Sequence, residues 1–159
     1  MIVVIETDMI LTPRQVDERA AVVREAVSWI GTPWQHASDI KGAGVDCGML
    51  LVRVFVDVGL AAPFDPRPYA RDFMLHKSEQ RFMGFVHDRC ARVEQPMFGD
   101  VVLFHHGKCL SHGGIVVGWP FIVHASNPRG CVLVEDVLRS DYAHKERIFY
   151  SYWARRGGT

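Results

Sequence analysis

The sequence predicts an α+β fold, in which helices from the first part of the chain pack on an antiparallel sheet formed by the second part. Two observations carry this prediction. Apolar residues recur at helical spacing up to about residue 58, whereas from Gly99 onward they fall in short runs typical of strands. Helices followed by strands favour separate layers over an alternating arrangement. With 159 residues, 48% of them hydrophobic, we expect residues 1–159 to form one domain.

The first predicted helix begins with a capping sequence. Thr12 is suited to cap the helix, Pro13 to its first position, and Gln15 to the reciprocal bond of a capping box. Its predicted core face consists of apolar residues spaced by four and three, namely Val16, Ala20, Val23, Val27 and Ile30, and Gly31 ends the helix. We expect the segment that follows, residues 31–36, to line one wall of a cleft.

A second predicted helix begins at Cys47, which is the first candidate for a catalytic residue. A glycine-bearing loop leads into Asp46 and Cys47, and the apolar residues Leu50, Leu51, Val54, Phe55 and Val58 then follow at helical spacing up to Gly59. Asp46 is suited to cap this helix. A helix N-terminus favours an anion, so we predict that the Cys47 thiol is predisposed to ionise and act as a nucleophile. The alternative is a small, buried apolar side chain.

The rest of the chain is predicted to form a loop, one or two further helices and several strands. Residues 61–69 have the composition of a proline-rich surface loop, and residues 71–92 predict one or two helices. Five β-runs follow, over residues 101–105, 114–117, 121–124, 131–135 and 147–153. Asp100 is expected to form a turn before the first of them, and residues 155–159 to be a frayed tail.

Two histidines flank a predicted turn at residues 118–120 and are candidate partners of the cysteine. In a hairpin centred near Gly118, His112 and His124 lie opposite each other on one face of the sheet. One imidazole can then take the proton of Cys47 while the other fixes its orientation. The two glycines that follow His112 leave space for a helix to approach.

Four motifs occur in order along the chain: Gly31-Thr32-Pro33-Trp34-Gln35-His36, Gly44-Val45-Asp46-Cys47-Gly48, Gly99-Asp100-Val101-Val102-Leu103-Phe104, and His112-Gly113-Gly114-Ile115-Val116 with Ile122-Val123-His124-Ala125. In this order the chain resembles NlpC-type cell-wall cysteine peptidases. Gly31-Thr32-Pro33 and Lys41-Gly42-Ala43-Gly44 resemble their phage-tail-associated subgroup. The resemblance implies a papain-like fold and hydrolysis of amide bonds in peptidoglycan stem peptides, typically next to γ-linked D-glutamate. It implies Cys47 as nucleophile, His112 as base and His124 as the third polar residue.

Two departures from this family concern substrate binding. The family usually has Asp-Cys-Ser-Gly, but this chain has Asp46-Cys47-Gly48-Met49, which lacks the serine hydroxyl that helps to read the substrate in some members. Trp34 and His36 stand where the family tends to carry tyrosines. We assign Trp34 to the substrate wall, and an imidazole N–H of His36 could assist the oxyanion beside a backbone N–H. Asp46 either caps its helix or faces a substrate amine.

Three alternatives to a peptidase stay open. A tail component or assembly factor could keep the fold and use its cleft only for binding. Acyl transfer or amide hydrolysis on lipid-linked substrates would predict a membrane-binding amphipathic helix, which the sequence does not show. A zinc site could use ligand types present in His105, His106, Cys109, His112, His124 and Cys131, but structural zinc sites usually have tighter paired spacings. We therefore expect no metal and no cofactor.

Composition limits the expected binding partners and cellular location of the protein. The formal net charge is zero, so nothing indicates a nucleic-acid surface. The Met1–Ile5 run is short and lacks a basic segment, which predicts neither a secretory signal nor membrane insertion. We therefore expect synthesis in the cytoplasm, with incorporation in a phage tail or virion as the route to the cell wall. The expected partners are peptidoglycan stem peptides and phage tail proteins.

Overall fold

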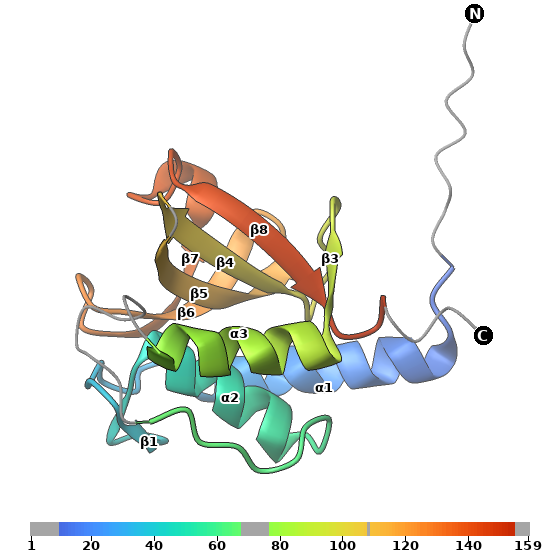
Figure 1. Cartoon of the computed structure of the whole chain (residues 1–159), viewed down its shortest axis with the longest axis horizontal. Coiled ribbons are helices and arrows are strands. Elements are labelled where there is room, and N and C mark those ends of the chain that lie inside the picture. The colour runs from blue at the N-terminus through green and yellow to red at the C-terminus, as the bar shows by residue number, and fades with distance from the viewer. Residues whose placement is uncertain (1–9, 68–76, 108, 155–159) are drawn as a thin grey trace, which may run out of the picture.

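Figure 1 shows the computed structural model, which describes residues 10–67, 77–107 and 109–154, without the side chains of residues 77–82. The Met1–Ile5 run, the expected tail at residues 155–159 and the first part of the predicted 71–92 helical segment lie outside the described residues.

The described residues form a layer of helices beneath one antiparallel sheet (Figure 1). The helices are α1 (Pro13–Ser28), α2 (Cys47–Asp57) and α3 (Lys77–Arg89), with a short 3-10 helix, η1 (Val137–Arg139). The sheet contains β3 (Ala91–Val93), β4 (Val101–His106), β5 (Cys109–Gly118), β6 (Phe121–Ser126), β7 (Cys131–Asp136) and β8 (Glu146–Ser151), in the order β3-β8-β4-β5-β6-β7. A separate ribbon pairs β1 (Asp39–Ile40) with β2 (Gly44–Val45). The predicted α+β fold with an antiparallel sheet is confirmed.

Helix α1 begins as predicted but buries a different face. The capping box is present, with the Thr12 N–H donating to the Gln15 side chain and the Gln15 N–H donating to Thr12 Oγ1. The buried residues, however, are Arg19, Val22, Ala26 and Trp29, whereas Val16, Val27 and Ile30 are 40–45% exposed. The predicted face was wrong because both sets follow helical spacing, and the alternative set buries a tryptophan together with a charge that finds a partner.

That partner is Asp100, at the start of β4. Arg19 Nη1 donates to Asp100 Oδ1 at 2.8 Å and to the Phe98 carbonyl at 2.9 Å, and Nη2 donates to Ser151 Oγ at 3.1 Å. The guanidinium also lies 4.2 Å from the centre of the Trp153 ring. Asp100 forms its turn as expected, because it accepts the Met97 N–H, and it also joins α1 to the sheet through a buried ion pair.

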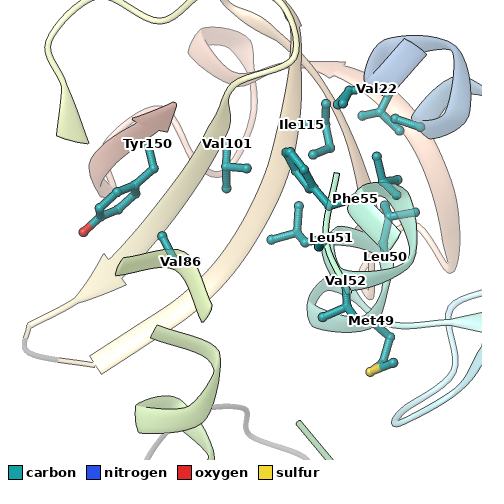
Figure 2. Close-up of a cluster of buried hydrophobic side chains, with 14 of the residues drawn as sticks. Val22, Met49, Leu50, Leu51, Val52, Phe55, Val86, Val101, Ile115 and Tyr150 are labelled. Atoms are coloured by element: carbon teal, nitrogen blue, oxygen red, sulfur yellow. The ribbon is translucent and has the colours of Figure 1, made fainter. Parts of the chain in front are cut away.

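Helix α2 is the centre of the hydrophobic core. Leu50, Leu51, Val54 and Phe55 are buried as predicted, and Figure 2 shows side chains of α2 close to those of α1, α3 and the sheet. A Cβ atom added to Gly113 would lie 2.9 Å from both Leu51 Cδ1 and Leu103 Cδ2. The absence of a side chain at Gly113 therefore lets α2 lie directly against β5, as the sequence predicted.

The five predicted strands are all present, as β4 to β8, and the turn between β5 and β6 lies at Trp119 and Pro120. The short strands β1, β2 and β3 were not predicted, because two or three residues carry too little periodicity to be recognised. In the part of the chain that the structure describes, we find no helix whose length and apolar character would allow it to cross a membrane.

Candidate active site

The N-terminus of α2 is held by Asp46. Its Oδ1 accepts the Met49 N–H at 2.9 Å, the bond of an N-cap, and its Oδ2 accepts the Ala37 N–H at 2.7 Å. The side chain is buried. The predicted capping role is confirmed, and the carboxylate also ties the segment around Ala37 to the start of the helix, directly before Cys47.

Cys47 is the first residue of α2 and is 7% exposed. Burial raises the pKa of the thiol, and the negative charge of Asp46 raises it further. The backbone N–H groups of Gly113, Gly48 and Cys47 counteract part of this increase. The prediction of a thiol predisposed to ionise is therefore wrong for the free protein, because the loss of hydration outweighs the helix terminus.

His112 and His124 contact each other, although not from opposite positions. Ile115 pairs with Val123, and continuing this register places Gly114 opposite His124, so the two histidines are diagonal neighbours. The predicted register is wrong because the turn lies at Trp119 and Pro120 and is not centred near Gly118. The irregularity between Val116 and Gly118 leaves both histidines on one face of the sheet. The imidazoles still meet, with His112 Nε2 2.6 Å from His124 Nδ1.

Both imidazoles are buried, with exposed fractions of 7% for His112 and zero for His124. Burial lowers the pKa of His112 well below its ordinary value, and electrostatic repulsion from His124 and Lys145 disfavours its protonated form further. Burial also lowers the pKa of His124, although Glu135 opposes this change. The geometry and the burial therefore favour two neutral rings at neutral pH.

Glu135 extends the histidine pair. Its Oε2 lies 2.8 Å from His124 Nε2, so a carboxylate, His124 and His112 form a continuous hydrogen-bonded chain. Arg129 Nη2 lies 3.7 Å from the other carboxylate oxygen. Sequence reasoning placed Glu135 at the end of a strand without a role, since only the register of β6 and β7 brings it to His124.

Tyr142 covers the two histidines. Its ring stacks on His112 with the centroids 4.8 Å apart, and it meets His124 edge-on at 5.6 Å. Burial raises the pKa of the Tyr142 hydroxyl to about 12, and the nearby negative charge of a Cys47 thiolate adds to the shift. Tyr142 is therefore a neighbour of both the cysteine and the histidine pair, although no local pattern in the sequence indicates this.

Cys47 approaches the same end of β5. The Gly113 N–H, in the residue after His112, faces the cysteine, and Leu51 one turn along α2 packs at the same glycine. Together with Tyr142, these contacts bring the Cys47 end of α2 to the His112 region of β5. The chemistry available there is that of a thiol, an imidazole and a carboxylate-linked second imidazole.

Trp34 and His36 lie on the segment that leads to Cys47. The Gly31 N–H donates to the Val132 carbonyl at 2.9 Å and the Trp34 N–H to the Gly130 carbonyl at 2.8 Å, so the segment runs along the outer edge of β7. Trp34 is half-buried against the core. The His36 side chain is 29% exposed, with Nδ1 4.0 Å from Asp46 Oδ2.

A backbone clamp after His36 was not predicted. Ala37 has a positive φ of 55°, which is uncommon outside glycine. Its N–H is held by Asp46, and its carbonyl accepts from Arg67 Nη1 at 2.9 Å. Arg67 is held in turn by Asp39 and Asp65. These contacts fix the turn that carries His36.

The residues considered as zinc ligands do not converge. Across residues 10–67, 77–107 and 109–154, no three histidine, cysteine, aspartate or glutamate side chains are arranged to hold a metal ion. His112 and His124 instead bond to each other.

The fold and the site define the class of protein: a papain-like α+β domain with a cysteine at a helix N-terminus and histidines on the adjoining sheet. The profile of the NlpC/P60 family matches residues 31–151, and the chain belongs to that family. No curated protein matches the chain.

Solved structures agree with this fold. The NlpC/p60 domain of the peptidoglycan hydrolase SagA superposes with a TM-score of 0.58 at 22% identity, covering 82% of this chain and 96% of that one. The peptidoglycan hydrolase RipB from Mycobacterium tuberculosis gives 0.60 at 20%, covering 90% and 68%. An NLP/P60 family protein from Staphylococcus aureus, described as similar to lipoprotein, gives 0.60 at 21%, covering 90% and 44%. The chain thus spans less than half of this last protein. The predicted papain-like NlpC fold is confirmed.

Proposed function

We propose that this protein is a cysteine peptidase that hydrolyses amide bonds in peptidoglycan stem peptides, next to γ-linked D-glutamate. The observation that carries the proposal is the 2.6 Å contact between His112 and His124 beside the helix terminus that presents Cys47. Family membership and the likeness to SagA and RipB, both described as peptidoglycan hydrolases, support the choice of substrate.

The reaction begins from a neutral thiol and a neutral imidazole. Since burial raises the pKa of Cys47 and lowers that of His112, the proton moves from sulfur to the imidazole as the sulfur attacks the amide carbonyl. Because His112 Nε2 is engaged by His124, Nδ1 is the nitrogen that remains to take this proton.

The remaining steps reuse the same groups. The amide C–N bond breaks as His112 gives its proton to the leaving amine, which leaves a thioester on Cys47. Water then loses a proton to His112 as it attacks the thioester, and the thiol and a carboxylic acid are released. His124 keeps His112 oriented throughout.

We assign the substrate wall to residues 31–36. The backbone N–H of Cys47 and an imidazole N–H of His36 would stabilise the oxyanion. Trp34 would contact the peptide beside the scissile bond. Asp46 acts on the substrate indirectly, because its two oxygens already bind the Ala37 and Met49 N–H groups and thereby position the wall relative to the cysteine.

We further propose that the protein acts from a phage tail or virion after synthesis in the cytoplasm, with tail proteins as partners. The Gly31-Thr32-Pro33 and Lys41-Gly42-Ala43-Gly44 motifs support this setting through the resemblance given above.

Digestion of purified peptidoglycan and soluble muropeptides, with products identified by mass, tests the peptidase. Wild type is expected to release split stem peptides, and the mass identifies the bond. Cys47→Ala should lose nearly all turnover while keeping the fold. Cys109→Ala is the matched control, because this half-buried thiol lies at the start of β5 and should leave turnover unchanged.

The main alternative is a tail component that binds through the same cleft without cutting. It would be favoured if neither wild type nor Cys47→Ala cleaves any muropeptide while both bind peptidoglycan equally well. The replacement of Ser-Gly by Gly48-Met49 motivates this comparison, although Met49 is buried, with 1% exposure.

A further inference from the structure

We propose that Glu135 is a positioning residue that fixes the tautomers of His124 and His112, so that His112 keeps an unprotonated Nδ1. This inference rests on the proposed peptidase, because it explains how the base is held ready. It starts from two contacts: Glu135 Oε2 lies 2.8 Å from His124 Nε2, and His124 Nδ1 lies 2.6 Å from His112 Nε2.

The direction of each hydrogen bond follows from Glu135. An ionised carboxylate only accepts, so His124 Nε2 must carry a hydrogen. A neutral imidazole carries one ring hydrogen, which leaves His124 Nδ1 as an acceptor. His112 Nε2 must therefore donate to it, and in a neutral His112 the hydrogen-free nitrogen is then Nδ1. The proposed mechanism requires this nitrogen to accept the thiol proton.

Without the carboxylate, the contact between the two rings does not select a direction. The reversed arrangement, in which His124 Nδ1–H donates to His112 Nε2, has the same 2.6 Å geometry. In that arrangement His112 Nδ1 carries a hydrogen and cannot accept the thiol proton. Glu135 selects one of the two hydrogen-bond directions, because its carboxylate requires His124 Nε2 to be a donor.

The surroundings hold the chain of contacts in place. His124 has no exposed surface, and Tyr142 covers both rings, stacked on His112 and edge-on to His124. The charged or titratable groups that face the pair are Cys47 on α2, Glu135 on β7, Arg129 in the turn before β7, and Tyr142 and Lys145 between η1 and β8. Arg129 approaches Glu135 Oε1 and leaves Oε2 to His124.

The test is the ¹⁵N NMR spectrum of the imidazole nitrogens in the full chain, recorded where both rings are neutral. Wild type should show a hydrogen on Nε2 of both His112 and His124. Glu135→Met removes the acceptor and should populate the reversed pair. Glu135→Gln should give a mixture, because its amide can accept or donate, and it decides the test if the methionine variant does not fold. Unchanged Nε2–H tautomers in the folded Glu135 variants would overturn the proposal.

Kinetics on muropeptides provide the second measurement. Both Glu135 variants should lower kcat by about 10- to 100-fold with little change in KM, since general-base catalysis contributes about 10²- to 10⁴-fold and only part of it depends on the tautomer. Glu146→Gln makes the same chemical change at an exposed site on β8 and should match wild type in both measurements.

The NMR measurement needs no substrate, so the two hypotheses fail separately. A wild-type protein that cleaves no muropeptide but shows the carboxylate-dependent tautomers contradicts the peptidase and leaves the role of Glu135 standing. If wild type cleaves muropeptides but the Glu135 variants keep the wild-type tautomers and kcat, only the positioning role is contradicted.

Discussion

Asp46 shows how much one buried side chain determines at this site. Its two oxygens accept two backbone N–H groups, one in α2 and one in the preceding turn, and its charge contributes to the raised pKa of Cys47. The same residue therefore positions Cys47, the proposed nucleophile, and favours its protonated form. A substitution that changes one atom of the side chain tests both effects.

Asp46→Asn is expected to lower stability and also lower the thiol pKa. Asparagine has one acceptor oxygen, so the Met49 or Ala37 N–H loses its partner, which costs about 1–3 kcal/mol for a buried group. Loss of the negative charge removes one cause of the raised pKa. Urea unfolding measures the first effect, and thiolate absorbance as a function of pH measures the second.

Asp136→Asn is the matched control for this substitution. Its side chain accepts one backbone N–H, from Leu138, at the start of η1, so an amide oxygen can replace the carboxylate. It should change stability far less and leave the Cys47 titration unchanged. Equal effects of the two substitutions would show that the double acceptor role of Asp46 is unimportant.

At the scale of elements, the approach of α2 to β5 determines whether the cysteine reaches the histidines. The two elements meet at Gly113, where any side chain would collide with Leu51 and Leu103. The neighbouring Gly114 allows the close approach of β6, since a Cβ there would lie 3.3 Å from His124 Cβ. Consecutive glycines thus allow close approach on two sides of one strand.

Gly113→Ala should displace α2 from β5. The added methyl overpacks the core, which costs about 1–3 kcal/mol, and the shifted cysteine should lower kcat/KM by about 10- to 100-fold. Gly118→Ala provides the control, because a Cβ there meets nothing within 4 Å. Urea unfolding and muropeptide cleavage are measured together, and wild-type kinetics in Gly113→Ala would contradict this account of the contact.

The ion pair between Arg19 and Asp100 joins a second pair of elements, α1 and β4. Asp100→Ala leaves a buried guanidinium without its carboxylate and should cost about 3–5 kcal/mol. The double variant Arg19→Met with Asp100→Leu should recover much of this loss, since it leaves no buried charge unpaired. Arg14→Ala, on the exposed face of α1, should leave the urea midpoint unchanged. Additive losses in the double variant would argue against a coupled pair.

At the scale of the whole molecule, the two neutral histidines make stability depend on pH. Their pKa values are lower in the folded protein than the ordinary value of 6.5. As pH falls through about 6.5, the unfolded chain binds protons that the folded protein does not, so the free energy of unfolding decreases. This contribution to stability is fully present above that pH.

Urea unfolding at about pH 7.5 and about pH 5.5 measures this dependence. Wild type should lose stability at the lower pH, and the double variant His112→Gln with His124→Gln should lose less. His106→Gln with His144→Gln, at exposed positions, should retain the wild-type difference. If all three proteins lose the same free energy, the buried pair is not the source.

The sequence predicted what depends on local patterns. The caps at Thr12 and Asp46, the start of α2 at Cys47 and the five long strands are all confirmed, because each has a signal within a few residues. The buried face of α1 was wrong because the burial of Arg19 depends on Asp100, far away in the chain. The register of the histidines was wrong because the turn lies at Trp119 and Pro120, beyond the Gly118 centre that the sequence predicted.

Residues recruited by tertiary structure left no local signal. Glu135, Tyr142 and Arg67 belong to the surroundings of the site only because strands and loops meet there. The pKa of Cys47 also depends on tertiary structure, because burial outweighs the effect of the helix terminus that the sequence predicts. The side chains proposed to carry the chemistry could thus be predicted more easily than those that support them.

The hydrogen bonds from residues 31–34 to β7 have a consequence for the newborn chain. Helices α1 and α2 are translated before β7. Cys47 is therefore synthesised before the strand to which residues 31–34 bind. Its histidines on β5 and β6 also follow later. The proposed peptidase can therefore become competent only after β7 has been translated, and a chain terminated before β5 would carry the proposed nucleophile without its histidines.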